Sequence, residues 1–173
     1  EKNMPIAKNA AEFYGIFNEP VHNAVEYVMS KILTNYKHLI NQIVYGRSPE
    51  EYERTYEFLE SWEAKSKKTR QGAVGEMSQD VSFMSYNPEA FQHGSLYTSY
   101  GDVRDELAGI IYQGLGGNLF GDGWWTNPRD PWTPLIHQLN EGKKLREWFI
   151  EGMEKQGIQC RSVGVGHNIS SFW

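Results

Sequence analysis

The stretch YERTYEFLESW, residues 52–62, decides the fold because the hydrophobic pattern changes its period there. Before it, apolar residues recur at helical spacing, whereas from Trp62 small or aromatic residues alternate with charged ones. Alternation with a period of two is typical of a half-buried strand. The stretch itself has Tyr52, Tyr56 and Leu59 on one face of a short helix. It therefore predicts a helix that leads into the first strand of a sheet.

A long helix is predicted on the N-terminal side of this stretch. Glu19 and Pro20 are expected to begin it, because proline is tolerated in the first helical turn, where its missing N–H has no intrahelical partner. The apolar stripe of the helix consists of Val21, Val25, Val28, Ile32, Tyr36, Leu39 and Ile43. Gly46 is expected to end the helix as a left-handed C-cap. Residues 1–18 are then expected to form an arm or a short helix of their own.

A hairpin and further helices are predicted on the C-terminal side. The hairpin strands are expected at residues 62–68 and 73–86, separated by a polar turn. The later elements are helices at about residues 102–112, 133–139 and 145–153, with Gly114, Gly142 and Gly157 at their ends, and a last strand at residues 158–165. Together they predict an α+β fold, in which a small, mainly antiparallel sheet is packed by the long N-terminal helix and the C-terminal helices. At 173 residues the chain suits a single domain over residues 1–173.

A long irregular segment, GLGGNLFGDGWWTNPRDPWTP, covers residues 114–134. Long loops without secondary structure are uncommon in compact domains and are often binding loops. Two interpretations of its tryptophans have equal weight. Trp124, Trp125 and Trp132 either anchor a partner, because a buried Trp can dominate an interface, or fold back as a lid over the domain's own core.

The composition argues against several classes of function. A net charge of -5 disfavours a nonspecific nucleic-acid binder, since phosphate contacts need clustered Lys and Arg. The one short basic cluster is interpreted as a solvated strand end and turn, and it consists of Lys65, Lys67, Lys68 and Arg70. The single cysteine, Cys160, excludes an intramolecular disulfide and fits a reducing compartment. Without a leader or a long uncharged apolar run, neither secretion nor membrane insertion is expected.

No set of side chains in the sequence specifies a nucleophilic enzyme. Cys160 and His167 are close in sequence, but a thiol protease needs a third, orienting group from a separate element. Cys160 is interpreted instead as a small buried hydrophobic residue of the last strand. Arg54 and Glu57 lack partners within their own stretch. The sequence therefore assigns no catalytic residue.

A metal site is equally unsupported by spacing. His93, His137 and His167, with Asp102 or Asp122, would have to converge from separate elements, because no two of them have the spacing that places two ligands on one helix. His137 is interpreted as a residue on a helix surface. No metal or cofactor is therefore expected.

Three short motifs follow the predicted long helix in a characteristic order. They are Y-x-R-T-x3-L-x-S-W at Tyr52, Arg54, Thr55, Leu59, Ser61 and Trp62, a His-Gly loop at His93 and Gly94, and an aromatic stretch at Pro131, Trp132, Pro134 and Leu135. Over residues 21–157 this order resembles the neck, head–tail connector and tail-completion proteins of tailed bacteriophages. The chain departs from the family pattern at Tyr56, where a glycine is common, and in the length of its segment 114–131.

The resemblance implies a structural virion protein without catalytic, cofactor-binding or metal-binding residues. It implies a homo-oligomeric ring at the head–tail junction, with portal or adaptor proteins and tail proteins as neighbours. DNA would pass through the lumen without sequence-specific contact, and no membrane would be involved. The chain is then expected in the virion, after assembly in the bacterial cytoplasm. The alternatives are a minor capsid, decoration or tail-terminator protein and, from another class, a small hydrolase that uses His93 or His167.

Overall fold

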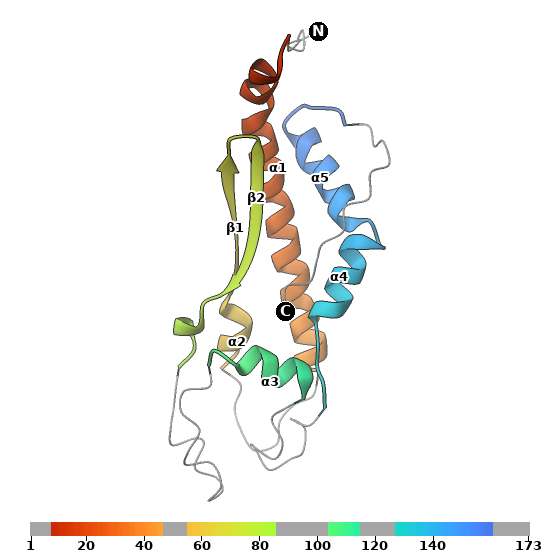
Figure 1. Ribbon diagram of the computed structural model, residues 1–173. Coiled ribbons are helices and arrows are strands. Elements are labelled where there is room, and N and C mark those ends of the chain that lie inside the picture. Colours follow the sequence, from red (N-terminus) through yellow and green to blue (C-terminus); the bar gives the residue numbers. More distant parts are fainter. Residues whose placement is uncertain (1–7, 47–54, 86–103, 115–126, 161–173) are drawn as a thin grey trace, which may run out of the picture. The chain divides into compact units, whose positions relative to one another are not determined.

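The computed structural model describes residues 8–46, 55–85, 104–114 and 127–160 (Figure 1). These residues belong to two compact units. Unit 1 takes its described residues from Glu1–Thr34, Ala64–Ser78 and Ile136–Trp173, and unit 2 takes its own from Asn35–Glu63 and Gln79–Leu135. A single domain over the whole chain stays a prediction.

The described elements confirm the predicted α+β class. In chain order they are α1 (Ala10–Leu39), the π-helical turn η1 (Ile40–Val44), α2 (Glu57–Glu60), β1 (Trp62–Thr69), β2 (Gly72–Gln79), the 3₁₀ turn η2 (Val81–Phe83), α3 (Leu107–Gln113), α4 (Trp132–Asn140) and α5 (Lys144–Lys155). The strands β1 and β2 form a two-stranded antiparallel sheet. The predicted hairpin, long N-terminal helix and C-terminal helices are therefore all present.

The long helix α1 begins at Ala10, so the predicted start at Pro20 is wrong and Pro20 lies inside the helix. Residues 10–18 are part of α1, so the separate arm or short helix predicted for residues 1–18 is wrong there. Asn9 and Glu12 fix the true start. Asn9 Oδ1 accepts a hydrogen bond from the Glu12 N–H at 2.9 Å, and Glu12 Oε2 accepts one from the Lys8 N–H at 2.8 Å. Such reciprocal capping satisfies N–H groups that the first turn of a helix leaves without partners. Proline removes a single internal hydrogen bond, which the capped helix tolerates.

The end of this helical run is confirmed near Gly46, but for a different physical reason. Gly46 is not among the glycines with positive φ, so the predicted left-handed cap is wrong. A Cβ atom at Gly46 would clash with the Gln42 carbonyl oxygen. The position requires glycine because the backbone approaches itself closely after η1.

The helix α2 is shorter than predicted. Tyr56 adopts a left-handed conformation with φ of 59°, and α2 starts only at Glu57. A left-handed residue cannot continue a right-handed helix. Leu59 is therefore buried while Tyr56 is 45% exposed, so the two do not share a buried helical face. Tyr52 lies outside the described residues.

The strand β2 is also shorter than predicted, because it ends at Gln79 instead of continuing to residue 86. Asp80 redirects the chain there. Its N–H donates to the Ser61 carbonyl oxygen at 2.7 Å, and its Oδ1 accepts the Ser82 N–H at 3.0 Å. The second bond caps η2, so the chain turns where the pattern predicted a strand.

The helices after the hairpin agree largely with the sequence. The helix α3 starts at Leu107, later than predicted, and Gly114 ends it in a left-handed conformation with φ of 68°. Gly157 follows α5 with φ of 77°. The last predicted strand is absent from its described part, residues 158–160, and its remainder lies outside the described residues.

Within unit 1, α1 lies between the hairpin and α5 (Figure 1). Two glycines mark close approaches. A Cβ atom at Gly75 of β2 would clash with Met29 Sδ, and one at Gly152 of α5 would lie 3.0 Å from Ala24 Cα. The buried apolar residues of this unit include Ala24, Val28, Met29, Ile32 and Met153.

Within unit 2, the core gathers side chains from the C-terminal part of α1, from η1 and from the short helices. Its buried apolar residues include Tyr36, Leu39, Ile40, Val44, Phe58, Leu59, Met84, Ile111, Tyr112 and Leu135. Two buried polar residues, Ser61 and Arg129, lie among them. Ser61 Oγ donates to the Phe58 carbonyl oxygen at 2.8 Å, and Arg129 Nη1 donates to the Val44 carbonyl oxygen at 3.4 Å.

Candidate protein interface

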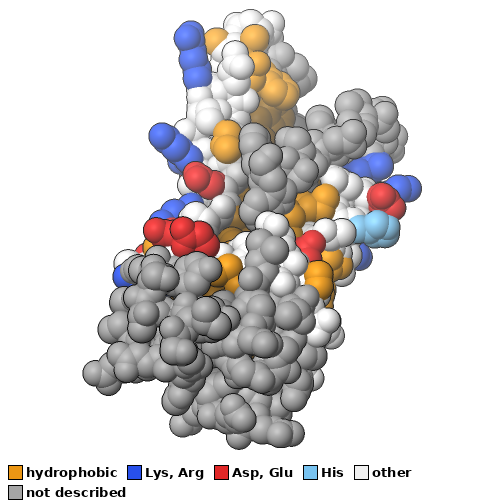
Figure 2. Space-filling model, turned by 60° about the horizontal axis from the view of Figure 1, so that its bottom comes forward, with side chains coloured by type: hydrophobic (Ala, Val, Ile, Leu, Met, Phe, Trp, Pro, Cys, Tyr) orange, Lys and Arg blue, Asp and Glu red, His pale blue; other side chains and the backbone are white. Residues whose placement is uncertain are grey.

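The first turns of α1 carry three aromatic side chains, Phe13, Tyr14 and Phe17, which we call the aromatic end. Phe13 is 48% exposed and Tyr14 is 37% exposed. The ring centroids of Phe13 and Phe17 lie 4.7 Å apart, and those of Phe13 and Tyr14 lie 5.9 Å apart. Hydrophobic side chains also gather at the upper end of the described surface in Figure 2. The aromatic end is thus an exposed cluster on a regular, capped helix.

The contacts of α1 with the hairpin and α5 lie on the C-terminal side of the aromatic end. Asn18 Nδ2 donates to the Thr69 carbonyl oxygen at 3.3 Å, and Glu19 pairs with Lys68. Asn23 Nδ2 donates to Gln156 Oε1 at 3.1 Å. These bonds hold the tip of the hairpin and the end of α5 beside α1. The exposure of α1 rises from there toward its N-terminus, and residues 8–15 are all exposed.

The aromatic end continues the face of α1 that is buried further along. Phe17, Val21, Ala24 and Val28 follow one another at three- and four-residue steps, so they share one face of the helix. Ala24 is fully buried and Val28 is 4% exposed. The same face is therefore core in the middle of unit 1, half-buried at Phe17 and solvent-exposed one turn earlier at Tyr14. Exposed apolar side chains gathered in this way mark contact sites.

Unit 2 contains a second aromatic cluster, which is centred on the buried Tyr36 and Tyr112 and includes the half-buried Trp62 and Trp132. The Tyr36 ring lies across those of Trp62 and Trp132, at centroid distances of 4.9 Å and 5.5 Å and nearly perpendicular angles. The hydroxyls of Tyr36 and Tyr112 are hydrogen-bonded to each other. Burial raises the pKa of both tyrosines above the ordinary value for a tyrosine.

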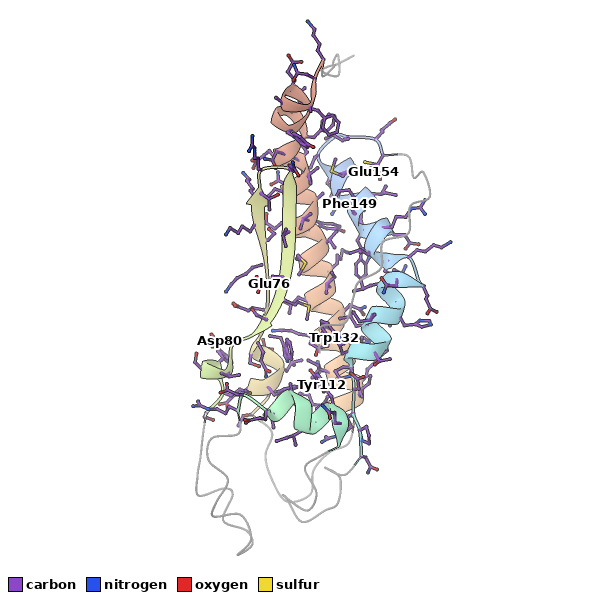
Figure 3. All side chains as sticks on the ribbon, viewed as in Figure 1. Glu76, Asp80, Tyr112, Trp132, Phe149 and Glu154 are labelled. Atoms are coloured by element: carbon purple, nitrogen blue, oxygen red, sulfur yellow. The ribbon has the colours of Figure 1, made fainter. Side chains whose placement is uncertain are left out.

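Trp132 therefore packs against the core of its own unit while remaining half-buried. Figure 3 shows Trp132 at the start of α4 and Tyr112 on α3. Asp130 Oδ1 fixes the start of α4 by accepting the Trp132 N–H at 2.7 Å. The packing of the half-buried Trp132 ring against Tyr36 agrees with the interpretation as a lid over the domain's own core, and contact of Trp132 with a partner stays a prediction. Trp124 and Trp125 lie outside the described residues.

Unit 2 also joins the backbone on either side of three segments that lie outside the described residues. The joining contacts are the Tyr45 and Tyr56 rings at 5.0 Å, the Arg104 Nη1 bond to the Met84 carbonyl oxygen at 2.8 Å, and the Arg129 N–H bond to the Ile111 carbonyl oxygen at 3.1 Å. Each contact joins the described residues on the two sides of one segment, and we call such a joined pair a stem. Unit 2 therefore holds the described residues on both sides of each segment close together.

Glu57 links two of these stems. Its Oε2 accepts the Ser85 N–H at 2.8 Å and the Ser85 hydroxyl at 2.7 Å. Hydrogen bonds from the Ser85 hydroxyl and then from the Ser85 N–H lower the pKa of the Glu57 carboxyl below its ordinary value. Glu57, which the sequence left without a partner, therefore acts as a structural clasp between residues far apart in the chain.

Several residues considered for chemistry fall outside the described part of the chain. They are Arg54, His93, Asp102, Asp122 and His167. The hydrolase alternative, which depends on His93 or His167, stays a prediction.

The remaining candidates are placed by the structure. His137 is exposed on α4, with Nε2 at 2.7 Å from Glu141 Oε2, which confirms it as a helix-surface residue. Cys160 is only half-buried and lies in no strand, so its interpretation as a buried strand residue is wrong. The basic cluster at the hairpin is exposed, as predicted, and its Lys68 pairs with Glu19.

Neither a metal site nor a membrane span is found in the part of the chain that the structure describes. Residues 8–46, 55–85, 104–114 and 127–160 include no group of His, Cys, Asp and Glu that is able to hold a metal ion. None of the described helices combines the length and apolar character needed to cross a bilayer. No protein-family model, curated protein or solved structure matches the chain.

The aromatic end is the candidate site that sequence reasoning missed, although its signal was present. Asn9 followed by Glu12 is a helix-start pattern, and Tyr14 and Phe17 continue the apolar spacing of the helix toward the N-terminus. The interpretation of Pro20 as a first-turn residue placed the predicted helix start ten residues too late, so neither pattern was used.

Proposed function

We propose that the chain is a structural subunit that works by contact with other copies of itself, as a homo-oligomeric ring at the head–tail junction of a tailed phage. The aromatic end of α1 supports the self-association, because it is an exposed continuation of a core face. The setting in the virion, with portal or adaptor proteins and tail proteins as neighbours, rests on the order of the sequence motifs.

Burial of the aromatic end would supply a favourable free energy for such contacts. A Phe side chain contributes about 1.5–3 kcal/mol when it moves from water to a fully buried position. Aromatic residues are also enriched among the residues that dominate interfaces. In a closed ring each subunit makes its contact with both neighbours, so a modest contact is repeated around the ring.

The mass of the full-length chain in solution tests the self-association. Light scattering is expected to show an oligomer for the wild type and a shift toward monomer for the double variant Phe13→Ser, Phe17→Ser. Phe83→Ser is the matched control, because Phe83 is 56% exposed in η2 but lies in unit 2. It is expected to keep the oligomer. A monomeric wild type would contradict the proposal. An oligomeric double variant would show that self-association does not depend on the aromatic end.

Electron microscopy of phage particles that contain the chain tests its proposed position at the head–tail junction. A ring with cyclic symmetry at the head–tail junction is the expected result. Copies spread over the capsid surface would instead support the minor capsid or decoration alternative. A chain that is absent from all particles would overturn the proposed place in the virion while leaving self-association to be judged by mass.

A further inference from the structure

The apolar face of α1 follows the spacing of a coiled-coil seam. Steps of four and three residues alternate along it, and its positions are Ala10, Tyr14, Phe17, Val21, Ala24 and Val28. Such a spacing keeps one narrow seam facing a neighbouring helix. Ala24 and Val28 are already buried within unit 1, whereas Tyr14 is 37% exposed. The N-terminal part of the seam therefore remains available for a helix from another molecule.

The distribution of charge around this seam favours a second copy of the chain. The positions that flank the seam are uncharged, and they are Ala11, Phe13, Asn18 and Pro20. In coiled coils the flanking positions usually carry the charges that select partners and orientation. Without charges there, identical helices can approach one another without repulsion. The wide apolar face that includes Phe13 also gives each helix room for a neighbour on either side.

The charged side chains of the same stretch lie away from the seam. Glu12 and Glu19 are seven residues apart and occupy the outermost position, opposite the seam. An amphipathic helix that binds anionic membranes usually carries Lys and Arg on its polar face. Glu12 is acidic and Glu19 is already paired with Lys68, so this polar face offers no row of cations to an anionic membrane, and a membrane is a poorer occupant than a second copy.

The aromatic end is also preformed, which lowers the cost of association. An isolated helix of this length would be marginal in water, because helix nucleation is unfavourable. Here the stretch is capped by Asn9 and belongs to the same helix as the buried part of α1. Binding would therefore order few additional backbone torsions.

We propose that the aromatic ends of neighbouring copies pack in parallel around the symmetry axis of the oligomer. The proposal rests on the self-association put forward above and adds its geometry. Helices related by a cyclic axis and directed along it are parallel by symmetry. Equivalent seam residues of adjacent copies then face one another, Ala10 toward Ala10 and Tyr14 toward Tyr14, while Glu12 of every copy points outward.

Cross-linking of single cysteines tests this geometry in the full chain. With Cys160 replaced by Ser, Ala10→Cys places a thiol on the seam, and Glu12→Cys places a matched thiol on the opposite side of the same turn. A short bismaleimide reaches between helices packed about 8–10 Å apart. We expect covalent dimers from Ala10→Cys and loss of the cross-link with Glu12→Cys.

The possible outcomes separate this geometry from self-association itself. An intact oligomer that cross-links from neither position, or equally from both, would overturn the parallel packing and leave the proposed function standing. Cross-links that appear only when Ala10→Cys is mixed with Phe17→Cys would show antiparallel helices and also overturn it. A wild type that is monomeric by light scattering would overturn both proposals together.

Discussion

Aromatic side chains have opposite environments in two regions of this molecule. In unit 2, Tyr36 is fully buried among other rings, and its hydroxyl is paired with that of Tyr112. In unit 1, Tyr14 and Phe13 stand exposed on a helix whose continuation is core. The comparison teaches that aromatic content alone does not distinguish a core from an interface. The distinction lies in whether other elements cover the rings and whether their polar atoms have partners.

The largest difference between the two regions is expected on truncation of a tyrosine. Tyr36→Ala should lower the free energy of unfolding by about 3–5 kcal/mol, because it empties a large buried site. Tyr14→Ala should change it by no more than about 0.5 kcal/mol, as is usual for exposed positions. Denaturant unfolding in the Phe13→Ser, Phe17→Ser background measures both without a contribution from association. Similar losses of unfolding free energy at Tyr36 and Tyr14 would show that the two regions do not differ in this way.

A second contrast concerns close packing around two helical glycines of unit 1. Gly152→Val should destabilise by about 1–3 kcal/mol, because even a Cβ atom there would lie 3.1 Å from the Ala24 Cβ and backbone oxygen. The same change at Gly15 meets no atom within 4 Å and should be close to neutral. Thermal unfolding of the two variants checks the difference. A neutral Gly152→Val would show that α5 moves away from α1 at little cost.

The hydroxyl pair of unit 2 gives a smaller but more specific effect. Tyr112→Phe removes one hydroxyl and leaves the buried Tyr36 hydroxyl without it, at a cost of about 1–3 kcal/mol. Adding Tyr36→Phe should recover part of the loss, since removal of both partners leaves no buried polar atom unpaired. Unfolding free energies of the two single variants and the double variant test this. Strict additivity would contradict coupling between the hydroxyls.

The smallest expected effect is a pH dependence at the Glu57 clasp. The pKa of Glu57 is lower in the folded chain, so its contribution to stability is present above the pKa of an unfolded Glu, about 4.3, and is lost as pH falls through the folded value. Glu57→Gln cannot ionise, so the advantage of the wild type at pH 7 should shrink on acidification. Melting temperatures between pH 7 and pH 3 measure this. A difference in melting temperature between the wild type and Glu57→Gln that stays constant with pH would contradict the stabilising role of the ionised Glu57.

Local patterns predicted most of the regular structure of this chain. The body of α1, the hairpin, α4 and α5 follow from hydrophobic spacing, and Gly114 and Gly157 end their helices with the positive φ that glycine accepts. These features depend on residues close together in sequence. They are therefore visible without knowledge of the fold.

The predictions from sequence were wrong where two local patterns favoured different structures, or where a contact between residues far apart in the chain overrode a local pattern. Pro20 suggested a helix start, but capping at Asn9 outweighed it. The strand pattern beyond Gln79 was overridden by the bonds of Asp80 with Ser61 and Ser82. The Tyr36–Tyr112 pair joins residues from separate elements, so nothing in the spacing of either could predict it.

The proline inside α1 has a mechanical consequence for any assembly built from this helix. Pro20 has no N–H, so the Ile16 carbonyl oxygen receives no helical bond from it, and α1 bends most easily at this point. The compliant joint lies between the aromatic end and the turns buried by α5. The aromatic end can therefore tilt while the core of unit 1 stays intact. Such a joint lets identical subunits absorb small angular errors when a closed assembly forms.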